Sequence, residues 1–341
     1  MPEKTLGLKV ERKDGERIRK ALVEAGVFDR SRKISSDASH VFLPILEIDE
    51  RLAAKLGRIG QFEMVEINFQ PEEKAINPED ILGFRPSFEI VGDIAMVEDR
   101  DAERVAAALM STNRSIKTVI SPVSDVEGEF RTRRFRHVAG EARTVTLHRE
   151  NGLRYRVDLE GAYFTPRLGT ERQRIAGLVR AGEVVLDMFA GVGPFSLLLA
   201  RKGARVIAID KNPVAVKYLR ENARLNKIVD IDIQEGDAAE LAIRSENQAD
   251  HVIMNLPHSA SEFLNPALRA AKQQGIIHYY CIAPEVDLYR DLALIKSEAD
   301  EIGLEVEMLY RNTVRSYAPH RYNVVIDFRV KKPDLTLRSL T

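Results

Sequence analysis

The stretch DMFAGVGPFS, residues 187–196, decides the fold. It begins within the apolar run EVVLDMF, which has the composition of a buried strand, and leads into a helical pattern that starts at Phe195. Gly191 and Gly193 remove side chains where the backbone has to turn closely against a ligand. Pro194 suits the first turn of a helix, where its missing N–H costs nothing. The stretch therefore predicts a strand, a glycine-rich turn and a helix, the unit that binds nucleotides in α/β proteins.

Strand and helix patterns alternate from about residue 170 onward. The expected strands are the runs EVVLDMF, ARVIAID, IDIQEGD, ADHVIMNLP, GIIHYYCIA, LEVEMLYRN and YNVVIDFRV. Helices are expected over 195–201, 213–225 and 286–303. This alternation predicts the α/β class, with a doubly wound, mainly parallel seven-stranded sheet. The last two strands have no helix between them, so we expect an antiparallel hairpin at the sheet edge.

The part before residue 156 has the pattern of smaller α+β units. Two short strands and two helices fill the first of them, and its helices stop at Gly26 and Gly57. The polar, proline-containing stretch 68–80 is typical of a linker or an exposed excursion. We therefore expect three domains, which are residues 1–58, 62–155 and 156–334.

Three patterns in the second of these domains bear on function. The run FEIVGDIAMVE is expected to form one strand. The run GEFRTRRFRHVAGE is expected to form another, in which arginine alternates with apolar residues and the guanidinium groups share one face. Asn151 and Gly152 supply the two positive-φ positions of a tight turn, which predicts a hairpin.

Composition excludes several classes of protein. The 341 residues are 44% hydrophobic and 30% charged, which is ordinary for a globular chain with a real core. No apolar run has the ~18–20 residues of a membrane span, and the start lacks the apolar stretch of a signal peptide. The one cysteine, Cys281, excludes a disulfide framework and a cysteine-based zinc site within one chain. We expect a cytoplasmic protein.

Charge is balanced overall but uneven along the chain. The net charge is −1, which makes a uniformly basic nucleic-acid binder improbable on composition. Residues 4–33, however, hold ten Lys and Arg against five Asp and Glu, and residues 131–149 hold six arginines against one glutamate. Such local basic faces suit a polyanion bound in a defined place, although a charge-rich surface explains them equally well. We assign no metal site, because no metal-ligand spacing is found among His137, His148, His251, His258, His278 and His320.

The glycine-rich turn has a ligand preference. Asp210 ends the second strand of the repeat, where a carboxylate accepts hydrogen bonds from ribose hydroxyls. A dinucleotide site requires a third glycine where this chain has Ser196, and the Gly-Lys-Ser/Thr of a phosphate-binding loop is absent. The pattern D-x-F-x-G-x-G with a later acid is instead that of S-adenosylmethionine sites. Alternatively, Asp187 and Asp210 merely cap local structure.

Further polar positions extend this candidate site. Asp237 follows the third strand, where it can bond an adenine amine, and Asn255-Leu256-Pro257 follows the fourth. Enzymes that methylate exocyclic amines carry an aromatic residue just after this Asn-containing motif, whereas this chain has His258, which argues against an exocyclic amine as acceptor. The candidate cofactor-binding residues are Arg172, Asp187, Phe189, Gly191, Gly193, Asp210, Lys211, Asp237, Ala238, Asn255 and Pro257.

Several collinear stretches resemble the archaeal tRNA (guanine-37 N1)-methyltransferases, relatives of the wyosine-pathway aminocarboxypropyl transferases. They are AYFTPRLGTERQRI (162–175), DMFAGVGPFS (187–196), AIDKNP (208–213), IMNLP (253–257), QGIIHYY (274–280) and SYAPHRYNVVIDF (316–328). The resemblance runs through residues 88–332 and continues more weakly to the N-terminus. It implies a Rossmann-like class I methyltransferase domain preceded by smaller RNA-binding domains.

The resemblance also implies roles for individual residues. The acceptor, guanine N1, becomes nucleophilic only as its proton leaves, so the reaction needs a base near N1 and a donor at O6. In the family the base is the glutamate of P-R-L-x-x-E-R, here Glu171, and the donor is the arginine of G-E-F-R, here Arg131. Asn255 completes the expected catalytic set, and Tyr163 is expected to position the target base.

A tRNA partner follows from the same resemblance. The N-terminal unit is expected to contact the tRNA elbow, and the arginine-rich stretch 131–149 the phosphates of the anticodon stem-loop. The candidate substrate-binding residues are Tyr163, Arg167, Arg133 and Arg134. We expect a monomer. Two alternatives stay open: transfer of the aminocarboxypropyl group of the same cofactor, and a non-catalytic RNA-binding protein.

Overall fold

The computed structural model describes residues 4–72, 76–98, 100–124 and 128–332, and the chain divides into two compact units, Met1–Asn77 and Pro78–Thr341. Each unit has its own hydrophobic core. Among the described residues, no helix has the length and apolar character needed to cross a membrane. The expected end of the last domain, residues 333–334, lies outside the described residues.

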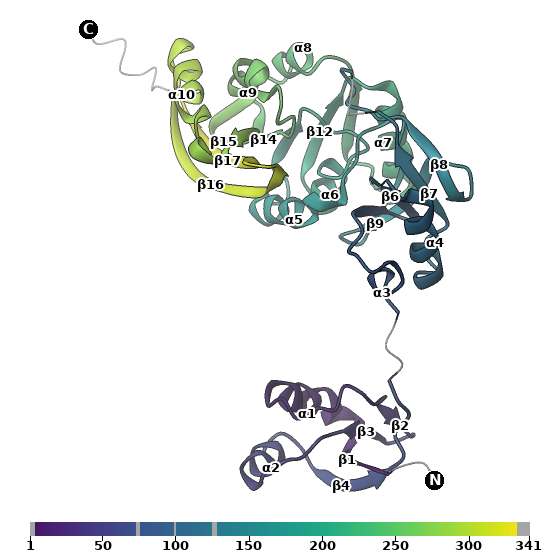
Figure 1. Cartoon of the computed structure of the whole chain (residues 1–341). Coiled ribbons are helices and arrows are strands. Elements are labelled where there is room, and N and C mark those ends of the chain that lie inside the picture. The colour runs from purple at the N-terminus through teal and green to yellow at the C-terminus, as the bar shows by residue number, and fades with distance from the viewer. Residues whose placement is uncertain (1–3, 73–75, 99, 125–127, 333–341) are drawn as a thin grey trace. The chain divides into compact units, whose positions relative to one another are not determined.

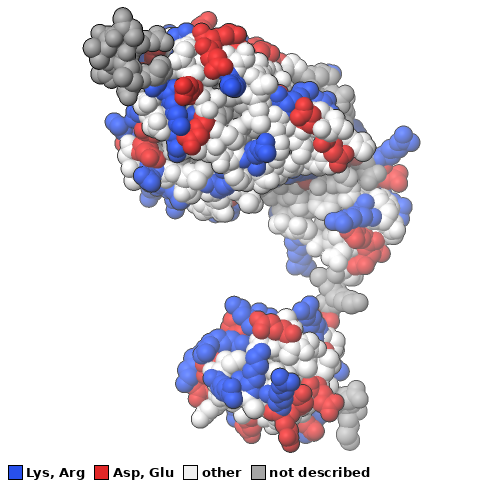
Figure 2. Space-filling view, turned by 90° about the vertical axis from the view of Figure 1, so that its left-hand side faces the viewer, with Lys and Arg blue, Asp and Glu red and all other residues white. Residues whose placement is uncertain are grey.

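The N-terminal unit is a four-stranded antiparallel sheet with two helices. Its elements are β1 (Thr5–Glu11), α1 (Arg12–Glu24), β2 (Ser35–Ser36), β3 (His40–Pro44), α2 (Glu50–Gly57) and β4 (Phe62–Ile67), and the strand order is β2-β3-β1-β4. Because β4 pairs with β1 along Thr5–Val10, the unit extends beyond residue 58, where the sequence placed its end. Basic and acidic side chains lie side by side on the face of this unit in Figure 2.

The second unit begins with a small mixed sheet. Its elements are α3 (Pro78–Leu82), β5 (Phe88–Val91), β6 (Ile94–Val97), α4 (Ala102–Thr112), β7 (Thr118–Pro122) and β8 (Phe135–Gly140), in the strand order β5-β6-β7-β8. The single strand expected over 88–98 is wrong, because the chain reverses at Gly92 (φ 60°) and makes two antiparallel strands. The arginine-bearing strand is also shorter than expected: it starts at Phe135, so Arg131 lies before it with a φ of 54°.

A hairpin connects this sheet to the larger one. β9 (Val145–Glu150) and β10 (Leu153–Asp158) pair in antiparallel register, and Asn151 and Gly152 take φ values of 52° and 74°. The predicted turn is therefore confirmed. Tyr155 of β10 belongs to the same buried cluster as Val91 of β5 and Leu219 of the large domain, so the two sheets of this unit share one core.

The large sheet has seven strands in the order β13-β12-β11-β14-β15-β17-β16 (Figure 1). The strands are β11 (Val184–Asp187), β12 (Arg205–Asp210), β13 (Ile231–Glu235), β14 (Ala249–Met254), β15 (Ala271–Pro284), β16 (Glu305–Ala318) and β17 (Arg321–Lys331). Its helices are α5 (Gly169–Leu178), α6 (Ser196–Arg201), α7 (Pro213–Leu225), α8 (Ala238–Ile243), α9 (Leu264–Ala270) and α10 (Asp291–Glu301). Short 3₁₀ turns lie at Pro166–Leu168, Ala260–Phe263 and Glu285–Asp287.

This sheet confirms the predicted fold class. β11 to β15 pair in parallel, whereas β17 is antiparallel to both β15 and β16. The strand order reverses at β11, which lies between β12 and β14. In open α/β sheets a ligand binds at such a reversal, outside the carboxyl ends of the strands.

Candidate functional site

A cavity opens at the carboxyl ends of the central strands. The predicted residues that line it are Arg131, Tyr163, Arg172, Phe189, Gly191, Asp210, Lys211, Asp237, Ala238, Asn255 and Pro257. They come from the loops that follow β11, β12, β13 and β14, and from segments outside the large sheet. The structure therefore brings most of the candidate cofactor residues to one place. Asp187, Gly193 and Glu171 are not in its wall.

The glycine turn after β11 is braced by the acid at the end of β12. The Gly191 N–H donates to Asp210 Oδ2 at 2.6 Å, and the Asn212 N–H donates to Oδ1 at 2.9 Å. Burial raises the pKa of the Asp210 carboxyl, although these two N–H bonds act the other way. Each carboxylate oxygen keeps a free lone pair. Asp210 can thus hold the loop and still accept hydrogen bonds from a ligand.

Gly193 and Asp187 shape this turn from behind the cavity. A Cβ on Gly193 (φ 95°) would lie 2.3 Å from Leu219 Cδ1, so the position excludes any side chain. Asp187 is buried, and its Oδ2 accepts a hydrogen bond from Ser196 Oγ at 2.5 Å, while Oδ1 has no partner. Burial raises the pKa of Asp187 to about 6. Both residues therefore support the loop, and neither contacts the cavity.

Part of the cavity wall, here called the apolar slot, is formed by Phe189 and Phe263 and is bordered by charged groups. Phe189 and Phe263 stack edge to face at 4.9 Å between ring centroids. Asp237 caps α8 by accepting a hydrogen bond from the Ala239 N–H at 2.9 Å. Its other oxygen accepts a hydrogen bond from Lys211 Nζ at 3.3 Å. An apolar slot bordered by carboxylates suits an adenosine, whose ring is flat and whose ribose and amine donate hydrogen bonds. The residues present thus fit S-adenosylmethionine.

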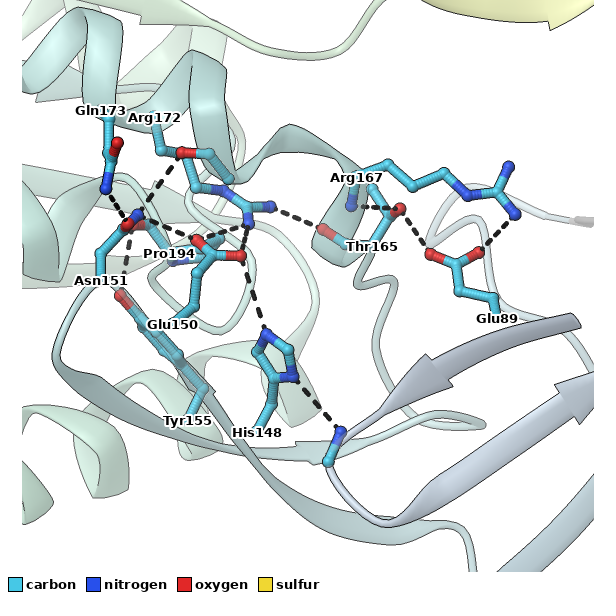
Figure 3. Close-up of polar contacts among 12 residues, drawn as sticks. Glu89, His148, Glu150, Asn151, Tyr155, Thr165, Arg167, Arg172, Gln173 and Pro194 are labelled. Atoms are coloured by element: carbon cyan, nitrogen blue, oxygen red, sulfur yellow. Dashed lines mark hydrogen bonds and ion pairs between the residues drawn. The ribbon is translucent and has the colours of Figure 1, made fainter. Parts of the chain in front are cut away.

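Arg172 lies in the wall with its guanidinium already engaged (Figure 3). Nη1 contacts both carboxylate oxygens of Glu150 at 2.9 and 2.7 Å, and Nη2 donates to the Thr165 carbonyl oxygen at 2.9 Å. Burial raises the pKa of Glu150, but His148, whose Nε2 lies 3.7 Å from the carboxylate, and the charge of Arg172 outweigh it and leave the pKa below its usual range. The third nitrogen of the guanidinium, Arg172 Nε, is buried without a partner. This arginine therefore ties α5 to the β9–β10 hairpin.

A second cavity adjoins the first. Arg131, Tyr163, Phe164, Thr165, Arg315 and Tyr317 line both of them. The predicted substrate residues Arg167 and Arg133 line only the second cavity, where they are paired with carboxylates: Arg167 Nη2 lies 3.1 Å from Glu89, and Arg133 Nη1 lies 2.8 Å from Glu98. Arg134 lines neither cavity, and its side chain is exposed.

Arg131 and Tyr163 face each other where the two cavities meet. The guanidinium carbon of Arg131 lies 5.8 Å from the centroid of the Tyr163 ring, and that ring is 43% exposed. No carboxylate among the described residues is within ion-pair distance of Arg131. A free guanidinium beside an accessible aromatic ring can receive a flat base and hydrogen-bond its carbonyl group.

Glu171 is placed differently from its expected role. It is 9% exposed, and Arg174 donates to both of its oxygens, with Nε to Oε2 at 2.9 Å and Nη2 to Oε1 at 2.7 Å. The Tyr280 hydroxyl donates to Oε1 at 2.7 Å. The carboxylate therefore points into a buried polar cluster instead of the cavity.

This cluster continues through the sheet. Arg174 Nη1 donates to Asp327 at 2.6 Å, His278 Nδ1 lies 2.8 Å from the same carboxylate, and His278 Nε2 lies 3.0 Å from His251. Burial and the neighbouring His278 lower the pKa of His251 to about 4.

Sequence reasoning left many residues of the cavity wall unassigned, among them His258, Arg315, Tyr317 and Asn323. Partial burial and the charges of Arg131 and Arg321 lower the pKa of His258, so its ring is neutral at pH 7. His258 directly follows the Asn255-Leu256-Pro257 motif, and Tyr317 lies in the quoted stretch 316–328. Their positions in or beside quoted motifs could therefore have identified these two residues as part of the site.

Comparison with known proteins agrees with this geometry. Residues 146–308 match the TRM5/TYW2 methyltransferase domain, residues 7–53 the tRNA methyltransferase 5 N-terminal domain, and residues 73–144 the TYW2 N-terminal domain.

Relatives with different activities are similar to the chain. Trm5b from Pyrococcus abyssi, a tRNA (guanine(37)-N(1))-methyltransferase, is 40% identical over 336 residues, which cover 96% of this chain and 99% of that protein. Its crystal structure superposes with a TM-score of 0.71. A tRNA(Phe) (4-demethylwyosine(37)-C(7)) aminocarboxypropyltransferase from Pyrococcus horikoshii is 35% identical over 268 residues, which cover 75% of this chain and 93% of that one.

A solved structure places a ligand in one such relative. It is TYW2 from M. jannaschii in complex with AdoMet, which is 26% identical, covers 72% of this chain and 100% of its own, and has a TM-score of 0.57. Since a relative that matches nearly its entire length is 40% identical, the chain belongs to the Trm5/TYW2 methyltransferase family.

Proposed function

We propose that this protein transfers a methyl group from S-adenosylmethionine to N1 of guanosine 37, the nucleoside 3′ to the anticodon of tRNA. The observation that carries the proposal is the cavity itself. Its wall combines the glycine turn and Asp210 with Arg131, which lies beside Tyr163 and is free of carboxylate partners among the described residues. The likeness to a tRNA (guanine(37)-N(1))-methyltransferase over nearly the whole chain supports it.

The cofactor would be held by groups that border the apolar slot. Asp210 would accept from the ribose hydroxyls, and Asp237 from the adenine amine, with Phe189 against the ring. When bound, S-adenosylmethionine supplies an electrophilic methyl group on its sulfonium. Gly191 has only the Tyr163 carbonyl oxygen, at 3.9 Å, near the position of a Cβ, so the backbone there is open to a ligand.

The protein has to stabilise the negative charge that develops on the guanine acceptor. Guanine N1 carries a proton, and negative charge gathers on O6 as that proton leaves. Arg131 would donate to O6, an interaction worth ~3–4 kcal/mol by analogy with oxyanion sites. Asn255, at the carboxyl end of β14, would orient the base edge, and Tyr163 would pack on its face. Because N1 is normally inside the base stack, the nucleotide has to be turned out.

Glu171 remains our proposed base, with a condition that the structure adds. Its carboxylate has to leave Arg174 and turn toward the cavity before it can accept the N1 proton. The neutral His258 ring is already in the cavity wall and is the competing proton acceptor.

The rest of the tRNA would bind outside the cavity. We propose that the N-terminal unit contacts the tRNA elbow, in keeping with its match to the tRNA methyltransferase 5 N-terminal domain. In the arginine-rich stretch 131–149, Arg133, Arg136 and Arg143 already pair with Glu98, Glu103 and Asp93. A monomer that acts in the cytoplasm, where the proposed substrate is processed, remains part of the proposal.

Transfer of the aminocarboxypropyl group is the second candidate, because a relative with that activity is 35% identical. Two cofactor preparations separate the candidates, one labelled in the methyl group and one in the carboxyl group. The proposal expects only the methyl label to enter tRNA. Incorporation of the carboxyl label would establish the second candidate. A non-catalytic RNA-binding protein would incorporate neither and would show no thermal shift with the cofactor.

A further inference from the structure

We infer that Arg315 of β16 binds the backbone phosphate of the target nucleotide as that nucleotide enters the cavity. The inference rests on the proposed function and names a contact for the same site. Arg315 lines both cavities, together with Arg131 and Tyr163. An RNA segment that reaches from the second cavity into the first has to pass these side chains.

Arg315 lacks the partner that a partly buried guanidinium normally has. No carboxylate among the described residues lies within 4.0 Å of it, and its Nε is buried without a hydrogen-bond partner. Buried polar groups are normally satisfied, and an orphaned one costs ~1–3 kcal/mol. A ligand anion would supply the missing acceptor, and a phosphate accepts bidentate bonds from a guanidinium.

The neighbouring strand repeats this feature. Asn323 on β17 is the register partner of Arg315, and it also lines the first cavity. It is 2% exposed, and its Oδ1 has no hydrogen-bond partner. Two unsatisfied polar side chains thus lie across from each other on adjacent strands. A bound molecule would supply the hydrogen-bond partners that these two side chains lack.

Arginines that pair with carboxylates elsewhere in this unit serve as a contrast. Arg329 on β17 is paired with Glu307 at 3.2 Å, and Arg133, Arg136 and Arg167 have carboxylate partners as well. An arginine that already pairs with a carboxylate gains little from a phosphate, because it has to give up one anion for another. Of the arginines that line the second cavity, Arg131 and Arg315 have no carboxylate partner among the described residues. Arg315 also has a buried Nε without a hydrogen-bond partner, as does Arg133, but Arg133 is paired with Glu98 through Nη1.

The test uses the full chain and a tRNA transcript with guanosine 37, assembled either with all phosphates or with one neutral methylphosphonate 5′ or 3′ of that nucleotide. We expect R315Q to weaken tRNA binding about tenfold and to reduce the slope of log K against log salt by about 0.7–0.9. One of the methylphosphonates should weaken wild-type binding similarly and leave R315Q unaffected. R315K should keep the salt slope, because it keeps the charge.

Controls separate this contact from other causes. R329Q removes the same charge outside the cavities and should keep the tRNA affinity of the wild type. The affinity for S-adenosylmethionine should be unchanged in R315Q. A tenfold loss of cofactor affinity would assign Arg315 to the cofactor carboxylate and overturn the inference. The inference would also be overturned if the loss of tRNA affinity caused by R315Q added to the loss caused by each of the two methylphosphonates. If the wild type methylates guanosine 37 and R315Q keeps the full affinity for tRNA, this inference alone is wrong. If the wild type does not bind tRNA, the proposed function is wrong as well.

Discussion

The carboxylate of Glu171 and the guanidinium of Arg174 lie face to face, joined by Nε to Oε2 at 2.9 Å and Nη2 to Oε1 at 2.7 Å. The same guanidinium holds Asp327, so one cation bridges two buried acids. Arginine does not give up its proton in proteins, so Arg174 cannot relay a proton away from Glu171. Because Arg174 engages both oxygens of the carboxylate, Glu171 has to leave this contact before it can act as the base at N1.

Replacement of Glu171 by glutamine tests the assignment of the base. Glutamine keeps the size of the side chain but cannot accept the N1 proton. We expect the single-turnover rate of E171Q to fall by about 10²–10⁴, with unchanged affinity for S-adenosylmethionine. H258Q is the matched variant in the cavity wall. Full activity in E171Q together with a collapse in H258Q would transfer the role to His258.

The pair of Arg172 and Glu150 predicts a stability effect. R172M leaves the Glu150 carboxylate buried without its partner, and breaking a buried pair costs about 3–5 kcal/mol. We expect urea unfolding to show that loss, and the double variant R172M/E150Q to recover part of it. An unchanged free energy of unfolding with a large loss of cofactor affinity would instead make Arg172 a cofactor ligand.

Alanine substitutions at three glycines distinguish the effects of backbone strain, side-chain packing and ligand contact. Gly182, Gly191 and Gly193 all have positive φ, but only Gly193 would bring a Cβ against a packed side chain, Leu219 at 2.3 Å. G193A should therefore lower the unfolding free energy more than G182A, which meets nothing within 4 Å and suffers strain alone. G191A should resemble G182A in stability and yet bind S-adenosylmethionine more weakly. Equal cofactor affinity in G191A and the wild type would contradict the placement of the ligand.

Asp187 predicts a pH dependence of stability. Its pKa rises to about 6 on folding, from an unfolded value near 3.9, so the folded state favours the protonated acid. The resulting stabilisation is present at low pH and is lost as the pH rises through 6, which leaves a cost of about 3 kcal/mol at pH 8. D187N should thus unfold at a higher temperature than the wild type at pH 8, and the gap should narrow toward pH 5. A gap that does not change with pH would rule out this titration.

The fold was predictable because its signals are local. The glycine turn at 187–196, the alternating strands and the Asn151–Gly152 hairpin are each set by neighbouring residues. The strand break at Gly92 was missed, since a single glycine within an apolar run does not reveal a reversal. The pairing of β4 with β1 was missed for another reason: antiparallel partners far apart in sequence leave no local trace.

The candidate site was predictable where backbone position alone decides it. Gly191, Asp210, Asp237 and Asn255 meet because they end parallel strands or follow them directly. Side-chain partners were not predictable. The engagement of Glu171 by Arg174 depends on which rotamers pack around it, and neither spacing nor resemblance records that choice.

The most direct measurement is the identity of nucleoside 37 after reaction. Purified protein is incubated with S-adenosylmethionine and with transcripts that carry guanosine or adenosine at position 37, and the digested RNA is analysed by mass. We expect 1-methylguanosine at position 37, a gain of about 14 Da from one methyl group, only in the guanosine transcript. A gain of about 101 Da, a methyl group at another position, or an equal product from the adenosine transcript would contradict it.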